Sequence, residues 1–148
     1  MIQYPMQFKV TSTGRSGIVA SWNTQVQNTN PSLESGLVAA IPPEFEGPGG
    51  GYSPEDFYAL ALINCFIATF KVFAEKSKLE FAKIHAEGSL TVDRNEKGVP
   101  WMSAFHLKVS LNGTTDGERA RRLLEKTSQS CMILNSVKSK ITFEYICE

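Results

Sequence analysis

Two cysteines with different surroundings are the residues of this chain best suited to chemistry. Cys65 lies within an apolar run from Phe57 to Phe70, whereas Cys131 follows a polar break at residues 127–130. One thiol of such a pair can attack an oxidant, and the other can resolve the product as a disulfide. The alternative is that both are ordinary core residues, because free cysteine is among the most buried residue types.

Nucleophilic chemistry at Cys65 requires a cation near its sulfur atom. The nucleophile is the thiolate, and a cysteine at its usual pKa of about 8.5 is mostly protonated at neutral pH. Arg15, in a glycine-flanked turn between two predicted strands, is the candidate cation, and Glu55 is the candidate carboxylate that would hold it. Their alternative readings are an exposed hairpin arginine and an acid that faces the helix dipole.

The spacing of Glu55 and Cys65 constrains this site. They are ten residues apart, which is about 15 Å along one helix, so they cannot touch within one chain. Either Arg15 bridges them, or Glu55 is contributed by a second subunit. A homodimer is therefore part of the active-site hypothesis.

A long helix is the element that carries Cys65. Ser53 is a suitable N-cap, Pro54 fits the first helical position, and Asp56 completes a capping pattern. We expect this helix to end at about Lys76 and, because it is apolar nearly all round, to be buried at the centre of the fold. Before it, the pattern predicts strands at 7–12, 18–22 and 37–41.

The remaining elements alternate between strands and helices. Period-two alternation predicts half-buried antiparallel strands at 84–93 and 104–111, and a final strand at 141–147. Asp116 should cap a second helix that turns Ala120, Leu123 and Leu124 inward, and a short helical segment is expected at 132–137. This order indicates an α+β fold, in a single domain over residues 1–148.

Composition limits the function classes. Of 148 residues 42% are apolar, as in a globular protein, and 15 basic residues balance 15 acidic ones, which argues against a nucleic-acid binder. Three cysteines do not make a disulfide scaffold, and the N-terminus does not read as a signal peptide. The apolar run at 57–70 is shorter than the roughly 20 residues of a membrane span, so we expect a cytoplasmic protein that does not bind membranes.

Metal and cofactor sites are not indicated. His85 and His106 have no metal-ligand spacing to one another or to the cysteines, and both fall on predicted polar strand faces. The glycine-rich segment 47–51 lacks the lysine of a phosphate-binding loop. Cys147 lies in the last strand pattern and is interpreted as structural. We therefore expect no metal and no cofactor.

The combined pattern resembles the OsmC/Ohr family of osmotically inducible and organic hydroperoxide resistance proteins. The segment from Ser53 to Cys65 is similar to that family's Pro-Glu helix start with a cysteine ten residues after the glutamate. Cys131, with an asparagine and a serine downstream, resembles its second cysteine, although Met132 stands where the family often has proline. Residues 13–17 resemble its arginine-bearing turn.

The resemblance implies an OsmC-like fold, with antiparallel sheets around a long buried central helix, in an intertwined homodimer. It implies a thiol-dependent peroxidase for organic hydroperoxides, with Cys65 as the peroxidatic cysteine and Cys131 as the resolving one. Arg15 would stabilise the thiolate and Glu55 would hold Arg15. A dithiol reductant, of lipoyl type in some members, would complete the cycle. The alternative is a non-catalytic member of the fold that binds an apolar ligand or is structural.

Overall fold

The computed structural model describes residues 3–5, 7–14, 17, 19–26 and 36–148. The chain forms two compact units, Met1–Phe57 and Tyr58–Glu148, which are considered separately below. The expectation of a single domain over the whole chain therefore stays a prediction. Arg15, the predicted cation of the site, lies outside the described residues.

The first unit contains a small antiparallel sheet in the order β1-β2-β3. Its strands are β1 (Val10–Thr13), β2 (Trp22–Val26) and β3 (Leu37–Ala39), followed by a short 3₁₀ helix, η2 (Pro43–Phe45). The prediction of a strand at 18–22 was wrong, because the turn extends further along the chain. The Ala20 N–H donates to the Gly17 carbonyl, and Gly17 has a positive φ of 98°, which favours glycine. Strand β2 consequently begins only at Trp22, and its pairing with β1 begins at Asn23, opposite Thr13.

The long helix α1 (Pro54–Lys76) begins and ends as predicted. Its first turn is closed by a reciprocal pair of hydrogen bonds: the Asp56 N–H donates to the Ser53 hydroxyl at 3.0 Å, and the Ser53 N–H donates to the Asp56 carboxylate at 2.9 Å. These bonds satisfy two of the backbone donors that a helix N-terminus leaves free. The predicted start of the cysteine-bearing helix is therefore confirmed.

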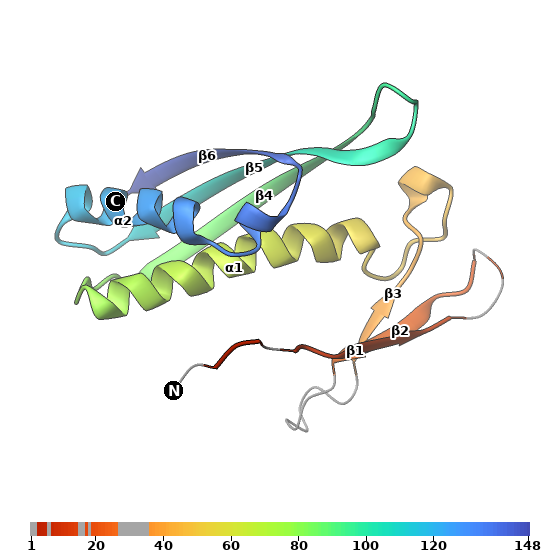
Figure 1. The fold of residues 1–148 in the computed structure, drawn as a ribbon, viewed down its shortest axis with the longest axis horizontal. Helices are drawn as coiled ribbons and strands as arrows, with labels where there is room; N and C mark the ends of the chain where they lie inside the picture. Colours follow the sequence, from red (N-terminus) through yellow and green to blue (C-terminus); the bar gives the residue numbers. More distant parts are fainter. Residues whose placement is uncertain (1–2, 6, 15–16, 18, 27–35) are drawn as a thin grey trace. The chain divides into compact units, whose positions relative to one another are not determined.

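The second unit is built on a larger sheet in the order β4-β5-β6 (Figure 1). Strand β4 (Lys83–Arg94) pairs with β5 (Pro100–Asn112) in antiparallel fashion, as predicted. Strand β6 (Lys140–Cys147) pairs with β5 in parallel, which differs from the antiparallel sheet expected. A parallel pair needs a long crossover, and α2 (Gly117–Ser130) with the 3₁₀ helix η3 (Leu134–Ser136) supplies it.

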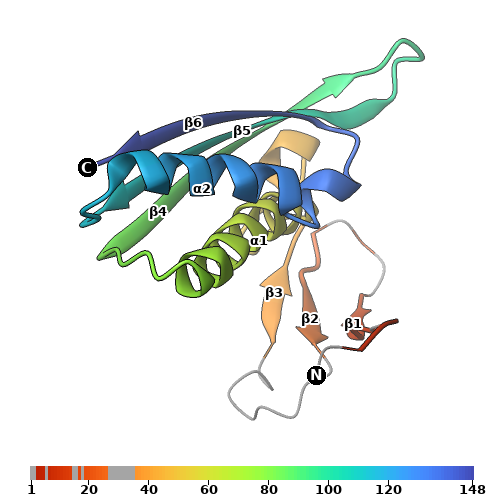
Figure 2. The ribbon, with the colours of Figure 1, turned by 60° about the vertical axis from the view of Figure 1, so that its left-hand side comes forward.

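The core of this unit lies between one face of the sheet and two helices. The views in Figures 1 and 2 show α1 and α2 on the same side of β4-β5-β6. Alternation along β5 turns four apolar residues inward, where they join buried residues of both helices. The inward residues of β5 are Phe105, Leu107, Val109 and Leu111. The α+β class predicted from the order of elements is confirmed.

A glycine lets α1 approach the sheet closely. A Cβ atom at Gly88 of β4 would lie 2.4 Å from Cζ of Phe105 and 2.9 Å from Cγ2 of Ile63 on α1. Both distances are far below van der Waals contact, so no larger residue fits without a shift. An isolated glycine inside a strand pattern is a known signal for close approach of this kind.

Helix α2 is fixed at its N-terminus and against α1. The Asp116 side chain accepts a hydrogen bond from the Arg119 N–H at 3.1 Å, so the predicted cap is confirmed. The three predicted inward residues, Ala120, Leu123 and Leu124, are buried, as is Thr127. The Arg119 guanidinium donates to the carbonyl of Ser77, just after α1, at 2.6 Å. The Arg119 side chain therefore links α2 to the residue that follows α1.

Helix α1 buries only one face within the single chain. Its buried residues are Leu62, Phe66, Phe70 and Ala74, whereas apolar residues such as Leu60 and Val72 are exposed. The helix has 23 residues and, by length and composition alone, would be long and apolar enough to cross a membrane. The buried face packs into the core beside the sheet, which is also the behaviour of a core helix in a soluble protein. In the single chain, therefore, one side of the helix is buried as expected, and the other side is exposed.

Candidate functional site

The structure brings Cys65 and Cys131 together. Cys65 is half-buried on α1, and Cys131 is fully buried at the residue that caps the C-terminus of α2. Both pack into the core cluster of the second unit, and Cys65 lies close enough to Cys131 to raise the pKa of its thiol. Residues from two helices therefore meet at one point, as two-step thiol chemistry requires.

The environment of Cys131 favours its protonated form. Burial is the largest cause that raises the pKa of Cys131, from 9.0 to about 11, and the hydrogen bond with Cys65 acts in the same direction. The backbone N–H groups of Leu134 and Ile133 point at the sulfur and partly offset this increase in the pKa. At neutral pH Cys131 is therefore a thiol that can donate its hydrogen to Cys65.

Backbone contacts hold Cys131 in place. Its N–H donates to the Thr127 carbonyl at 2.8 Å, which closes the last turn of α2. The side-chain amide of Asn135 donates to the Cys131 carbonyl at 2.7 Å and to the Ser128 carbonyl at 3.1 Å. These bonds satisfy carbonyls that the end of a helix leaves free. Asn135 thus orients the segment that follows the cysteine, which has Met132 rather than proline.

A second polar contact joins α1 to the segment after Cys131. The Ser139 hydroxyl donates to the Met102 carbonyl of β5 at 2.6 Å, so its oxygen is free to accept from the Tyr58 hydroxyl, also at 2.6 Å. Ser139 is buried and Tyr58 is half-buried. The three groups form a short chain of hydrogen bonds from α1 to the sheet.

Glu55 lies in the first turn of α1, in the first compact unit. One of its carboxylate oxygens is buried and has no hydrogen-bond partner among the described residues. A buried carboxylate oxygen is costly unless a donor meets it. Of the four predicted site residues, Cys65 and Cys131 lie together in the structure. Glu55 is on the same helix as Cys65, and Arg15 lies outside the described residues.

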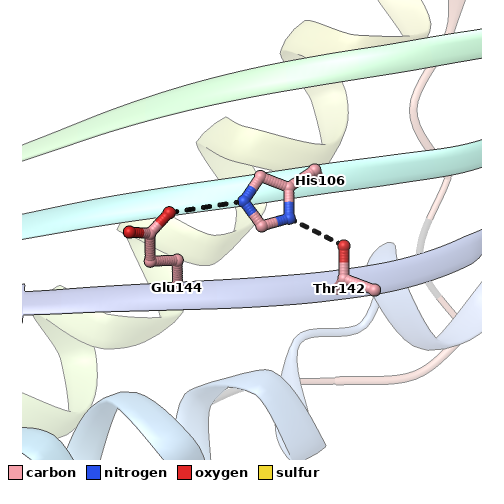
Figure 3. A network of polar contacts seen from close by, with 3 residues as sticks. All are labelled: His106, Thr142 and Glu144. Carbon is pink, nitrogen blue, oxygen red and sulfur yellow. Dashed lines mark hydrogen bonds and ion pairs between the residues drawn. The ribbon is translucent and has the colours of Figure 1, made fainter.

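The histidines lie on the other face of the sheet. His106 is exposed on β5, where its ring meets the Thr142 hydroxyl at 2.7 Å and the Glu144 carboxylate at 3.5 Å (Figure 3). His85 is exposed on β4 beside Glu87. Since alternate residues of a strand point to opposite faces, neither ring faces the cysteines. The prediction that both are surface residues is confirmed.

Cys147 is the third cysteine of the chain. It ends β6, is half-buried, and packs against the core cluster as an apolar residue. This agrees with its interpretation as structural. Within the described ranges, no group of three or more histidine, cysteine or acidic residues is arranged to hold a metal ion.

Sequence reasoning missed three polar residues near the site: Tyr58, Ser139 and Asn135 as a side-chain cap. In the sequence Tyr58 is one residue of an apolar run, and Ser139 precedes the last strand without a pattern of its own. The hydrogen bond between Tyr58 and Ser139 joins residues 81 positions apart, so no local sequence pattern predicts it. For Asn135 a signal existed, because asparagine is common where backbone groups at helix ends need partners.

Comparison with known proteins places these features in context. The family model described as OsmC-like protein matches residues 47–146, which is more than half of the chain. An uncharacterized Bacillus subtilis protein, YmaD, is 26% identical over 121 residues, covering 76% of this chain and 80% of that protein. The match with the family model includes Cys65, Cys131 and Glu55 but not Arg15.

Solved structures show the same fold. An OsmC-like protein of unknown function from Vibrio cholerae has a TM-score of 0.79 at 17% identity, over 96% of this chain and 100% of that one. An organic hydroperoxide resistance protein from Legionella pneumophila has a TM-score of 0.75 at 16% identity, over 99% of both chains. The organic hydroperoxide resistance protein OhrB of Bacillus subtilis has 0.69 at 17%, over 97% and 98%. The expected OsmC-like fold is confirmed.

Proposed function

The chain belongs to the OsmC-like protein family, and on that premise we propose that it is a thiol-dependent peroxidase that reduces organic hydroperoxides. The observation that carries the proposal is the contact between Cys65 and Cys131 in the core of the second unit. The names of two similar structures, both organic hydroperoxide resistance proteins, support the choice of substrate.

In the first step the Cys65 thiolate attacks one oxygen of the peroxide O–O bond. The bond breaks, Cys65 becomes a sulfenic acid, and the alkoxide leaves and takes up a proton to give the alcohol. Cys65 is the attacking residue because the raised pKa of Cys131 keeps that residue protonated at neutral pH.

In the second step Cys131 resolves the sulfenic acid. Its sulfur attacks the Cys65 sulfur, a disulfide forms, and the hydroxyl group leaves with the Cys131 proton as water. The disulfide then needs two electrons from outside the chain. A dithiol reductant, of lipoyl type in some members of the family, would supply them by thiol–disulfide exchange.

Arg15 and Glu55 complete the proposed site. Arg15 stabilises the Cys65 thiolate, and Glu55 holds the guanidinium in position. The buried carboxylate oxygen of Glu55 supports this role, because it has no partner among the described residues and requires a donor. A guanidinium is a suitable donor, since it presents several N–H groups in a planar arrangement.

In this proposal the protein acts in the cytoplasm as a homodimer and needs no cofactor. The exposed apolar residues on α1 favour a second copy as the partner of this helix. Apolar surroundings of Cys65 favour an alkyl hydroperoxide over hydrogen peroxide. Phe66 and Phe70 of α1 are fully buried in the core and are therefore packing residues rather than residues of a substrate pocket.

Thiol counting tests the proposal. Reduced protein is mixed with a stoichiometric amount of cumene hydroperoxide, and free thiols are titrated after denaturation. Wild type should lose two of its three thiols, whereas Cys65→Ser should lose none. Cys131→Ser should lose one thiol and yield a sulfenic acid that dimedone traps. Cys147→Ser is the matched control and should still lose two.

Peptide mapping assigns the disulfide to Cys65 and Cys131. Unchanged thiols in wild type would overturn the peroxidase and leave the alternative, a non-catalytic OsmC-like protein that binds an apolar ligand or is structural. A disulfide that includes Cys147 would overturn the assignment of Cys131 as the resolving residue.

A further inference from the structure

Two polar contacts connect α1 with one short segment, residues 131–139. The first is the thiol contact between Cys65 and Cys131. The second is the hydroxyl contact between Tyr58 and Ser139, at 2.6 Å. Each contact pairs a residue of α1 with one end of the segment, so the segment is attached to the helix at both ends.

The positions along α1 match the two ends. Tyr58 and Cys65 are seven residues apart, which is about two turns of a helix and leaves them on nearly the same side. Between the two contacts, the segment forms η3 and buries Leu134 in the core. It is therefore a short connection fixed at three points, and its first residue is the proposed resolving cysteine.

We propose that Tyr58 and Ser139 are positioning residues for the resolving step, and that their hydroxyl pair holds the 131–139 segment against α1 so that Cys131 reaches the oxidised Cys65. This inference rests on the proposed function. Neither hydroxyl touches the reacting sulfur atoms, and neither gains or loses a proton in the reaction.

The chemistry of the resolving step explains why such an anchor matters. The two sulfur atoms must move from their separation in the reduced protein to a bonded separation of about 2.05 Å, with a defined torsion about the new bond. Cys131 can meet these requirements only if its segment stays close to α1 while its own end shifts. Ser139 provides the fixed end, because its hydroxyl is also bonded to the Met102 carbonyl of β5.

The two hydroxyls are not equivalent. Removal of the Tyr58 hydroxyl leaves the bond from Ser139 to Met102 intact, so the fold keeps its contact with β5. Removal of the Ser139 hydroxyl leaves both the Tyr58 hydroxyl and the Met102 carbonyl without this partner, which destabilises a part-buried region. Tyr58→Phe is therefore the sharper test of positioning.

The test follows both steps after a single addition of cumene hydroperoxide to reduced protein. In Tyr58→Phe the rate of alcohol formation should equal that of wild type, whereas disulfide formation should slow by roughly two- to tenfold, the effect expected from one hydrogen bond. Dimedone should consequently trap more sulfenic acid on Cys65 than in wild type. A residue with only a structural role would not change this partition.

Tyr145→Phe is the matched control. It removes the same atom from a tyrosine in the same core, whose hydroxyl lies near Ser128 of α2 and makes no hydrogen bond to residues 131–139, all of which the structure describes. Its dimedone partition should equal that of wild type. The inference would be overturned by equal disulfide rates in Tyr58→Phe and wild type, or by the same decrease in Tyr145→Phe.

A second measurement separates this inference from the proposed function. The equilibrium between the Cys65–Cys131 dithiol and disulfide is measured in a dithiothreitol redox buffer, which requires no peroxide. Tyr58→Phe should shift this equilibrium toward the dithiol by a similar factor. Wild type that forms the disulfide in this buffer but does not react with peroxide would overturn the peroxidase alone. An unshifted equilibrium together with unchanged kinetics would overturn the positioning role alone.

Discussion

At the scale of single residues, the two cysteines are chemically unequal. Cys131 is fully buried at the end of α2, and burial raises its pKa to about 11, whereas Cys65 is half-buried on α1. A thiol that stays protonated at neutral pH is a weaker nucleophile toward the peroxide than a thiolate. The structure thus places the two cysteines in different environments, and their assignment as peroxidatic and resolving residues stays a prediction.

The raised pKa of Cys131 predicts a dependence of stability on pH. Below pH 9 this thiol is protonated in both the folded and the unfolded state, so it makes no difference to stability. Above pH 9 the unfolded thiol ionises while the folded one stays protonated up to a pKa of about 11, so stability falls across this window. The free energy of unfolding should decrease by at most about 1.4 kcal/mol per pH unit from this group.

Urea unfolding of the reduced protein at several values of pH between 8 and 11 checks this prediction. The comparison that isolates the group is Cys131→Ala, because other residues, including Tyr145 with its raised pKa, titrate in the same direction. The variant should show a shallower decrease than wild type. Parallel curves for the two proteins would contradict the assignment of the pKa.

At the scale of elements, the sequence predicted α1 and the elements that follow it well because their signals are local. The capping residues at Ser53 and Asp116, the length of α1 and the alternation in β4, β5 and β6 all appear in the structure as expected. The strand predicted at 18–22 lies instead at Trp22–Val26, because the chain still turns at Ala20, whose N–H donates to the Gly17 carbonyl. The parallel pairing of β6 was not predictable from alternation, since both orientations give the same period.

Gly88 gives a prediction about how α1 packs on the sheet. Gly88→Ala should lower the free energy of unfolding by about 1–3 kcal/mol, because the new Cβ atom overlaps Phe105 and Ile63. Chemical denaturation of the reduced protein measures the change. Gly117→Ala is the matched control: this glycine begins α2, and a Cβ atom there meets nothing within 4 Å.

The control variant should be neutral or slightly more stable, because alanine is a better helix former than glycine. Equal stabilities of Gly88→Ala and wild type would mean that α1 and the sheet are less tightly packed at this point than the distances indicate. The same decrease in both variants would mean that backbone conformation, rather than contact with Phe105, controls the effect.

At the scale of the whole molecule, the proposed homodimer predicts a specific response to charge. Val72 of α1 is 50% exposed in the single chain, on a helix whose opposite side lies in the core. If a second copy covers this side, Val72→Glu should weaken the dimer, because an unpaired carboxylate would be buried at the interface. Sedimentation or light scattering should then shift from about twice 16.3 kDa toward the mass of one chain.

Ser89→Glu is the control for this prediction. Ser89 is exposed on β4 and is paired in register with His106. Glutamate at this position adds the same charge, but on the polar face of the sheet. This variant should have the mass of wild type. A wild-type protein with the mass of a single chain would contradict the homodimer, and an unchanged mass for Val72→Glu would exclude this side of α1 as the interface.

The sequence by itself determined the local elements and the identity of the candidate cysteines, because caps, periodicity and glycine turns act over a few residues. It also identified Glu55 and Arg15 as candidates, and their roles stay predictions. Only the tertiary structure decided that Cys65 meets Cys131, that Tyr58 meets Ser139, and that Gly88 admits α1. These contacts join residues distant along the chain, and their geometry follows from packing two helices on one sheet face rather than from any local pattern.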